Sequence, residues 1–133
     1  MGRVSAGAGR AELPGDRWTD PPVDGPETLG DERLLAAFGR RATAANLDRV
    51  VRLGALLEQG ETGDLAEAGR QEAESLAHQV VGSAGTFGHP AASLDAARLE
   101  RFFASTVPVH ERPSEEREHA RATLERLAAE LGG

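Results

Sequence analysis

The stretch that most clearly indicates the fold is DLAEAGRQEAESLAHQVVGSAGTFGHP, residues 64–90. Its apolar side chains recur at the spacing of one helical face, which predicts an amphipathic helix. That predicted face consists of Leu65, Ala73, Leu76, Val80, Ala84 and Phe87. Asp64 is suited to cap the N-terminus of this helix, and Gly88-His89-Pro90 is suited to end it.

Further helices are predicted on both sides of this stretch. The expected elements are a helix over 43–58, a turn over 59–63, a helix from Pro90, a loop over 105–112 and a last helix from Pro113-Ser114 to Gly132. No segment of useful length alternates between apolar and polar residues, so no sheet is expected. Amphipathic helices with short connections predict an all-α fold, an antiparallel up-down four-helix bundle.

The N-terminal part of the chain has a different character. Residues 1–30 hold four of the seven prolines and show no periodicity, which predicts a disordered Pro/Gly-rich tail ahead of a bundle over 31–133. In this tail, Trp18 is either an isolated exposed aromatic residue or a docking residue. A short extra N-terminal helix is expected to start at the N-cap Asp31 and to end or loosen at Gly39. Its apolar face would be Leu34, Leu35 and Phe38.

Composition argues against several classes of protein. The formal net charge of −7 is unsuited to a nucleic-acid surface. All basic residues are Arg and none is Lys, which is typical of GC-rich bacterial genomes. There is no Cys for a disulfide or a thiolate site. No apolar run approaches the ~20 residues that span a bilayer, and no secretory apolar segment is present. A cytoplasmic, monomeric protein without membrane contact is expected.

The most informative polar residue of the predicted helix over 64–90 is His78. At ~100° per residue it lies opposite the apolar face, so its imidazole is expected to face solvent. Gly82 and Gly85 would stand beside this ring, although each glycine costs ~1 kcal/mol relative to Ala inside a helix. Two interpretations remain open. Either the glycines clear space for a partner that reacts with His78, or the helix frays after Val81 around an ordinary surface histidine.

A resemblance to a known family bears on this choice. The run His78-Gln79-Val80-Val81-Gly82-Ser83-Ala84-Gly85-Thr86-Phe87-Gly88 resembles the phosphorylation motif of histidine-containing phosphotransfer (HPt) domains, including the first domain of chemotaxis histidine kinases. In that family a His on a bundle helix is followed by an apolar residue, usually a Lys, then Gly, a small residue and a later Gly. Leu99-Glu100 resembles the Leu-Glu of the family's next helix. The resemblance covers about residues 31–131 and implies a four-helix bundle that carries a phosphoryl group.

Carried over to this sequence, the resemblance makes His78 the phosphoryl acceptor and donor. It implies that Gly82 gives access, with Ser83 as the small residue and Gly85 shaping the helix end. It also implies that Glu100 orients the imidazole, because a carboxylate that accepts from Nδ1–H leaves Nε2 free as the nucleophile. Glu100 could equally be a solvated charge. The residues expected to contact a docking partner are Gln71, Glu74, Ser75, Gln79 and Val81.

One departure from the family pattern concerns charge. Val81 stands where the family usually has a Lys that helps to neutralise the phosphate, and its apolar side chain is expected to be exposed. Its presence would slow transfer, or make the site depend on Arg from elsewhere, or mark a module that docks without transferring. The candidate arginines are Arg70, Arg98 and Arg101.

The function expected from the resemblance is that of a histidine phosphocarrier in a two-component phosphorelay, an intermediate and not an autonomous enzyme. A receiver domain or a histidine kinase would be the partner; Mg²⁺ would sit on the receiver, and this chain would hold no cofactor. The alternative is a degenerate HPt-like bundle that acts as an interaction module. A metal-binding bundle is a third hypothesis, since Glu74 and His78 could supply two ligands, but no convincing metal site is expected from the spacing of the other histidines.

Overall fold

The computed structural model describes residues 26–132, with side chains described from Gly30 onwards. The chain divides into two compact units, one that ends at Ala36 and one that starts at Ala37. The predictions made for residues 1–25, namely the disordered tail and the role of Trp18, lie outside the described residues.

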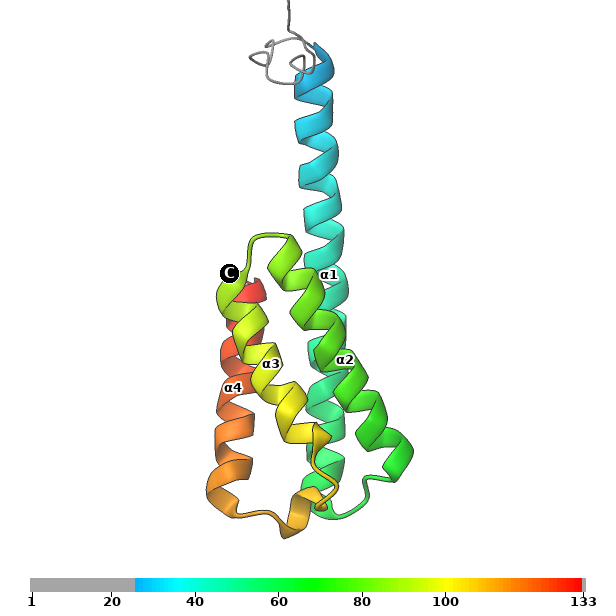
Figure 1. Ribbon diagram of the computed structural model, residues 1–133, viewed down its shortest axis with the longest axis vertical. Helices are drawn as coiled ribbons and strands as arrows, with labels where there is room; N and C mark the ends of the chain where they lie inside the picture. The colour runs from blue at the N-terminus through cyan, green and yellow to red at the C-terminus, as the bar shows by residue number, and fades with distance from the viewer. Residues whose placement is uncertain (1–25, 133) are drawn as a thin grey trace, which may run out of the picture. The chain divides into compact units, whose positions relative to one another are not determined.

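Residues 26–132 are folded almost entirely into helices. The elements are α1 (Pro26–Thr62), α2 (Glu67–Thr86), α3 (Pro90–Ala104), the short 3₁₀ helix η2 (Val109–Glu111) and α4 (Ser114–Gly132). In the unit that starts at Ala37, successive helices run in alternating directions, with α2 beside α3 and α3 beside α4 (Figure 1). The described residues contain no strand. This is the predicted all-α, up-down four-helix bundle.

Two N-terminal predictions were wrong. The predicted tail reached residue 30, but α1 begins at Pro26, whose fixed φ suits the first turn of a helix. No separate short helix precedes the bundle, because α1 continues through Gly39 to Thr62. A single glycine costs only ~1 kcal/mol, which is too little to break a helix of this length. The apolar residues predicted for the short helix are exposed in the structure: Leu34 by 52%, Leu35 by 65% and Phe38 by 42%.

The turn between α1 and α2 lies further along the chain than predicted, over residues 63–66 and not 59–63. Gly63 reverses the chain with a φ of +87°, a left-handed conformation that glycine adopts without strain. Asp64 was expected to cap α2, but its backbone N–H donates to the carbonyl of Gln59 at 2.8 Å and so completes the last turn of α1. The helix α2 therefore begins later than predicted, at Glu67.

The later boundaries agree with the predictions. Gly88, with a φ of +86°, follows α2, and Pro90 occupies the first turn of α3. The last helix starts at Ser114 with two acidic residues in its first turn, which complement the helix dipole. The predicted loop over 105–112 contains η2, which the periodicity did not indicate.

The core of the unit from Ala37 onwards is built mainly from leucine and alanine. Its buried apolar residues come from all the described helices: Val50, Leu53, Leu56, Leu57, Ala73, Ala77, Val80, Ala84, Ala92, Ala96, Leu99, Phe102, Phe103, Val109, Ala120, Leu127 and Leu131. Alanines supply most of the buried positions of α2, so this helix can approach α3 closely. Of the face predicted for α2, Phe87 is 38% exposed. None of the helices within 26–132 combines the length and the apolar character needed to cross a bilayer.

Candidate functional site

His78 lies on α2 with its side chain turned away from the core. Its sequence neighbour Ala77 and the nearby Val80 are fully buried, whereas the His78 side chain is 73% exposed. The helical phase predicted this exposure. The imidazole is therefore accessible to another molecule without any movement of the bundle.

A carboxylate on the neighbouring helix contacts one nitrogen of this ring. Glu100 on α3 places Oε2 at 2.9 Å from Nδ1 of His78, and the Glu100 side chain is 30% exposed. An ionised carboxylate can only accept a hydrogen bond, so Nδ1 must carry the proton in this contact. In the neutral ring the lone pair is then on Nε2, which is the nitrogen left free to react.

The glycines beyond His78 belong to an intact helix. α2 continues to Thr86, so the interpretation in which the helix frays after Val81 is not supported. A Cβ atom added at Gly82 would meet nothing within 4 Å, so no packing requirement explains this glycine. Its effect is to leave the surface one turn beyond His78 without a side chain. Gly85 differs, because an added Cβ would lie 3.4 Å from Oγ of Ser93 on α3.

Two residues of the motif do not have the surroundings expected for them. Val81 was expected to be an exposed apolar group, but it is half-buried and packs against the core. Ser83 is directed towards α1, where its Oγ accepts a hydrogen bond from the buried Asn46 at 3.2 Å. Ser83 therefore contributes to the contact between α2 and α1, and its side chain forms no hydrogen bond with His78 or Glu100 in the described structure.

The other residues predicted to meet a partner lie along α2 on both sides of His78. Gln71, Ser75 and Gln79 are exposed. The amide of Gln79 donates to the hydroxyl of Ser75 at 3.3 Å, and the amide of Gln71 donates to Glu67 at 3.0 Å. Glu74, one turn before His78, is half-buried. These side chains offer mainly polar groups to an approaching surface.

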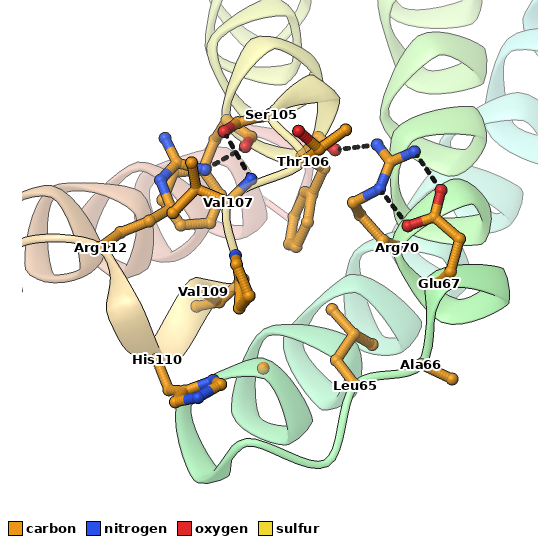
Figure 2. Close-up of a pocket in the computed structure, with 14 residues that line it drawn as sticks. Leu65, Ala66, Glu67, Arg70, Ser105, Thr106, Val107, Val109, His110 and Arg112 are labelled. Carbon is orange, nitrogen blue, oxygen red and sulfur yellow. Dashed lines mark hydrogen bonds and ion pairs between the residues drawn. The ribbon is translucent and has the colours of Figure 1, made fainter.

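A hollow separate from His78 lies where α2 begins and α3 ends, next to η2 (Figure 2). Its lining includes Leu65, Val109, His110 and two arginines, but neither His78 nor Glu100. Arg112, one of the two arginines, donates to the carbonyl of Phe102. Its guanidinium lies 3.9 Å from the centre of the Phe102 ring. Arg112 thus covers the C-terminal end of α3, where unpaired carbonyls need donors.

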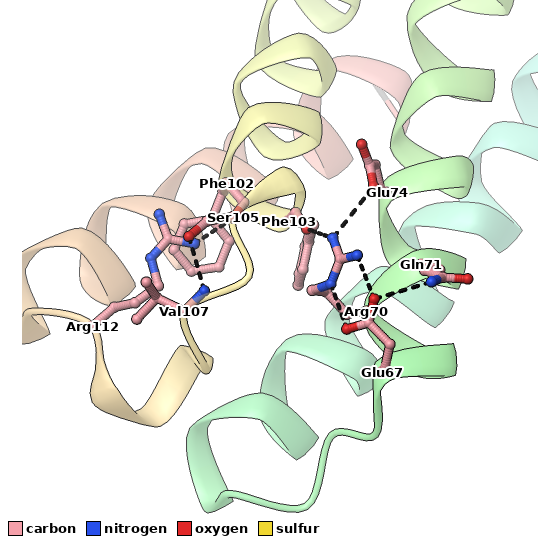
Figure 3. Close-up of polar contacts among 9 residues, drawn as sticks. All are labelled: Glu67, Arg70, Gln71, Glu74, Phe102, Phe103, Ser105, Val107 and Arg112. Atoms are coloured by element: carbon pink, nitrogen blue, oxygen red, sulfur yellow. Dashed lines mark hydrogen bonds and ion pairs between the residues drawn. The ribbon is translucent and has the colours of Figure 1, made fainter.

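The second arginine of the hollow, Arg70, is engaged on three sides (Figure 3). Its guanidinium donates to Glu67 at 2.6 and 2.9 Å, to Glu74 at 3.4 Å and to the carbonyl of Phe103 at 2.6 Å. The hydrogen bond from Arg70 lowers the pKa of Glu67 to about 2. The charge of Arg70 is therefore balanced by carboxylates and is not directed at His78.

The remaining candidate cations differ in their contacts. Arg98 donates to the buried carboxylate of Asp95 at 2.6 Å, so it is committed to a contact within α3. Arg101 is exposed and follows Glu100 directly. Within residues 26–132 no three side chains of His, Asp or Glu gather in a way that could hold a metal ion.

Several residues with a part in the site were not found from the sequence. Ser93 of α3 donates from Oγ to the carbonyl of Val81 at 2.8 Å, which ties the two helices together beside the motif. Asn46 of α1, only 1% exposed, holds Ser83 and accepts from Arg49. Ser93 precedes Glu100 by the same seven residues by which Gly85 follows His78, and this shared spacing was the available signal.

Comparison with models of protein families identifies the family of this chain. The family described as Hpt domain matches residues 45–131, which is most of the chain and includes both His78 and Glu100. Searches of curated proteins and of solved structures returned no match.

Proposed function

Because the chain belongs to the Hpt domain family, whose members are phosphotransfer carriers in phosphorelays, we propose that His78 is its phosphoryl acceptor and donor. The observation that carries this proposal is the contact between Nδ1 of His78 and Oε2 of Glu100 at 2.9 Å. It pairs the nitrogen that should hold a proton with a carboxylate and directs Nε2 to solvent. A histidine that served only as surface would need neither feature.

The proposed transfer can be written atom by atom. The Nε2 lone pair attacks the phosphorus of an aspartyl phosphate on a receiver domain, and an Nε2–P bond forms. The P–O bond to the aspartate breaks, and its electron pair leaves with the carboxylate. The Nδ1 proton remains on the ring, which becomes cationic, and the adjacent Glu100 carboxylate stabilises that charge. The reverse step returns the phosphoryl group to an aspartate.

The bundle contributes positioning and little other chemistry to this transfer. Phosphoryl transfer depends mainly on alignment and on neutralising charge, and the described residues around His78 include the carboxylates of Glu74 and Glu100. We expect the partner, a receiver domain or a histidine kinase, to supply the Mg²⁺ and the cationic side chains. The partner would contact Gln71, Ser75, Gln79 and the open surface at Gly82.

A second candidate function is an interaction module without transfer. It is favoured by the charges near the site, because Val81 replaces the family's usual Lys and both Arg70 and Arg98 are engaged by carboxylates. Such a module would bind a receiver domain through the same face of α2 and leave the phosphoryl group where it was.

The two functions separate in one experiment. Labelled, phosphorylated receiver domains from the same cell are incubated with the wild type, with His78→Gln and with His119→Gln, a matched change of an exposed histidine on α4. Acid-labile, base-stable label on the wild type and on His119→Gln, but not on His78→Gln, is the expected result. Binding of a receiver without label on any folded variant would favour the interaction module.

A further inference from the structure

Three polar contacts join α2 to α3, and His78 lies in the middle one. The hydroxyl of Ser93 donates to the carbonyl of Val81 at 2.8 Å, Glu100 meets His78 at 2.9 Å, and Arg70 donates to the carbonyl of Phe103 at 2.6 Å. We call these three contacts the α2–α3 seam. Two of them end on backbone carbonyls, so they fix one helix axis relative to the other and not merely one side chain.

The spacing of the seam is regular on both helices. His78 and Gly85 are seven residues apart on α2, and Ser93 and Glu100 are seven residues apart on α3. Seven residues are about two turns, or about 10 Å, so each pair lies on one face of its helix. Because the helices are antiparallel, Ser93 lies beside the turn of α2 that holds Gly85 when Glu100 lies beside His78, two turns away.

Gly85 lies directly against Ser93. A Cβ atom at this position would lie 3.4 Å from Oγ and 3.9 Å from Cβ of Ser93. The first of these distances is at the short limit of ordinary van der Waals contact, so an added methyl group would fill the space directly beside the Ser93 hydroxyl. Gly82, by contrast, faces open space, which means that the two glycines of the motif have different reasons to be glycine.

At the other end of the seam, Arg70 is held in a fixed orientation. Glu67 accepts from two of its nitrogens (Figure 3). The Arg70 side chain is only 16% exposed. The same guanidinium also donates to the carbonyl of Phe103, three residues beyond Glu100 on α3. The His78–Glu100 contact therefore lies between two hydrogen bonds that join α2 to α3, one on each side.

We infer that Ser93 is a positioning residue for the His78–Glu100 contact, with Gly85 making room for it. Ser93 acts through the backbone and touches no reacting atom. A slide of α3 by about 1.5 Å, the rise of one residue, would misalign the contact between Nδ1 and Oε2, and hydrogen bonds weaken steeply with misalignment. The role in transfer rests on the function proposed above, whereas the effect on the ring does not.

The test compares Ser93→Ala and Gly85→Ala with Thr86→Ala. Thr86 also donates a hydroxyl to a carbonyl of α2, that of Gly82 at 2.8 Å, but this bond stays within α2. The readout is the two-bond ¹H–¹⁵N spectrum of the His78 ring, which reports the nitrogen that carries the proton and needs no partner. A purely structural role would lower the unfolding free energy without changing this spectrum.

We expect the wild type and Thr86→Ala to hold the proton on Nδ1, and Ser93→Ala and Gly85→Ala to show a mixture of tautomers. In transfer assays kcat should fall about tenfold in those two variants with KM unchanged, since small displacements of a reacting group are costly. An Nδ1–H ring in both seam variants, identical to wild type, would overturn the inference. A tautomer mixture in a protein that never accepts label would support the seam and contradict the phosphocarrier.

Discussion

Helix α3 carries two carboxylates with opposite surroundings, Asp95 and Glu100. Glu100 reaches α2 and meets an imidazole that is 73% exposed. The Asp95 side chain is 3% exposed and reaches α4, where it accepts from Arg126 at 3.0 and 3.1 Å as well as from Arg98 on its own helix. One carboxylate is placed where chemistry can use it, and the other where it can only hold helices together.

The pKa values around Asp95 fit that division. Burial raises the pKa of Asp95, but the hydrogen bonds from Arg126 and Arg98, with other contacts, outweigh burial and hold the pKa below its ordinary value. Burial raises the pKa of the neighbouring Glu130, and the Asp95 carboxylate raises it further. Oε1 of Glu130 is buried and has no hydrogen-bond partner. The cluster between α3 and α4 thus holds one carboxyl firmly ionised and a second that resists ionisation.

The largest expected effect separates the two carboxylates by activity. Glu100→Gln should lower the rate of phosphoryl transfer by about tenfold to 100-fold, because the ring loses the acceptor that orients it. Its unfolding free energy should change little, since exposed ion pairs contribute little to stability. The measurements are single-turnover transfer and urea unfolding. A large loss of stability with transfer intact would reverse the roles assigned to Glu100 and Asp95.

Asp95→Asn should produce the opposite pattern. We expect it to lower the unfolding free energy by about 1–3 kcal/mol at pH 7, because charge-assisted hydrogen bonds to a buried carboxylate are lost, with little change in transfer rate. The pKa of Asp95 is depressed in the fold, so its contribution is present above the ordinary Asp pKa of ~3.9 and is lost as the pH falls through the folded value. Urea titrations should therefore show a smaller difference between wild type and Asp95→Asn at pH 3 than at pH 7.

The Val81→Lys variant tests whether the absence of a cation at this position of α2 limits phosphoryl transfer. A half-buried position can accept Lys when the ammonium group extends to solvent, and a cation near the phosphoryl group is worth ~1 kcal/mol in water. We expect phosphoryl transfer to speed up about fivefold, with Val81→Met as the uncharged control. Equal rates for the Lys and Met variants would indicate that the partner alone neutralises the phosphate.

Glu130→Gln should have the smallest effect, and its sign depends on pH. The pKa of Glu130 is raised in the fold, chiefly by burial, so ionisation of this carboxyl destabilises the folded state. The Gln variant should then be more stable by about 0.5 kcal/mol or less. As the pH falls through the raised pKa the wild-type carboxyl is protonated, and the gain should disappear by about pH 4. A gain that persisted in acid would point to packing instead.

The sequence predicted the exposure of His78 and its contact with Glu100 better than it predicted the hydrogen bonds around them. Periodicity placed His78 on the solvent side of α2, and the resemblance paired it with Glu100. Ser93 and Asp95 were missed because their partners are a backbone carbonyl and a helix that is distant in sequence, and apolar periodicity identifies neither kind of partner. The bounds of α1 were wrong at Gly39, and the start of α2 was wrong at Asp64, because propensity and capping rules are local. The continuation of α1 through Gly39 and the reversal of the chain at Gly63 prevailed over these local preferences.

Phosphorylation by a small-molecule donor tests directly, without a protein partner, whether His78 is the phosphoryl acceptor. ¹⁵N-labelled protein is phosphorylated with phosphoramidate, and the ring nitrogens of His78 are observed by NMR. We expect a phosphoryl group on Nε2 of His78, with the proton retained on Nδ1 beside Glu100, and no such signal in His78→Gln. Phosphorylation at Nδ1, or on another histidine while His78 stays unmodified in the folded protein, would contradict it.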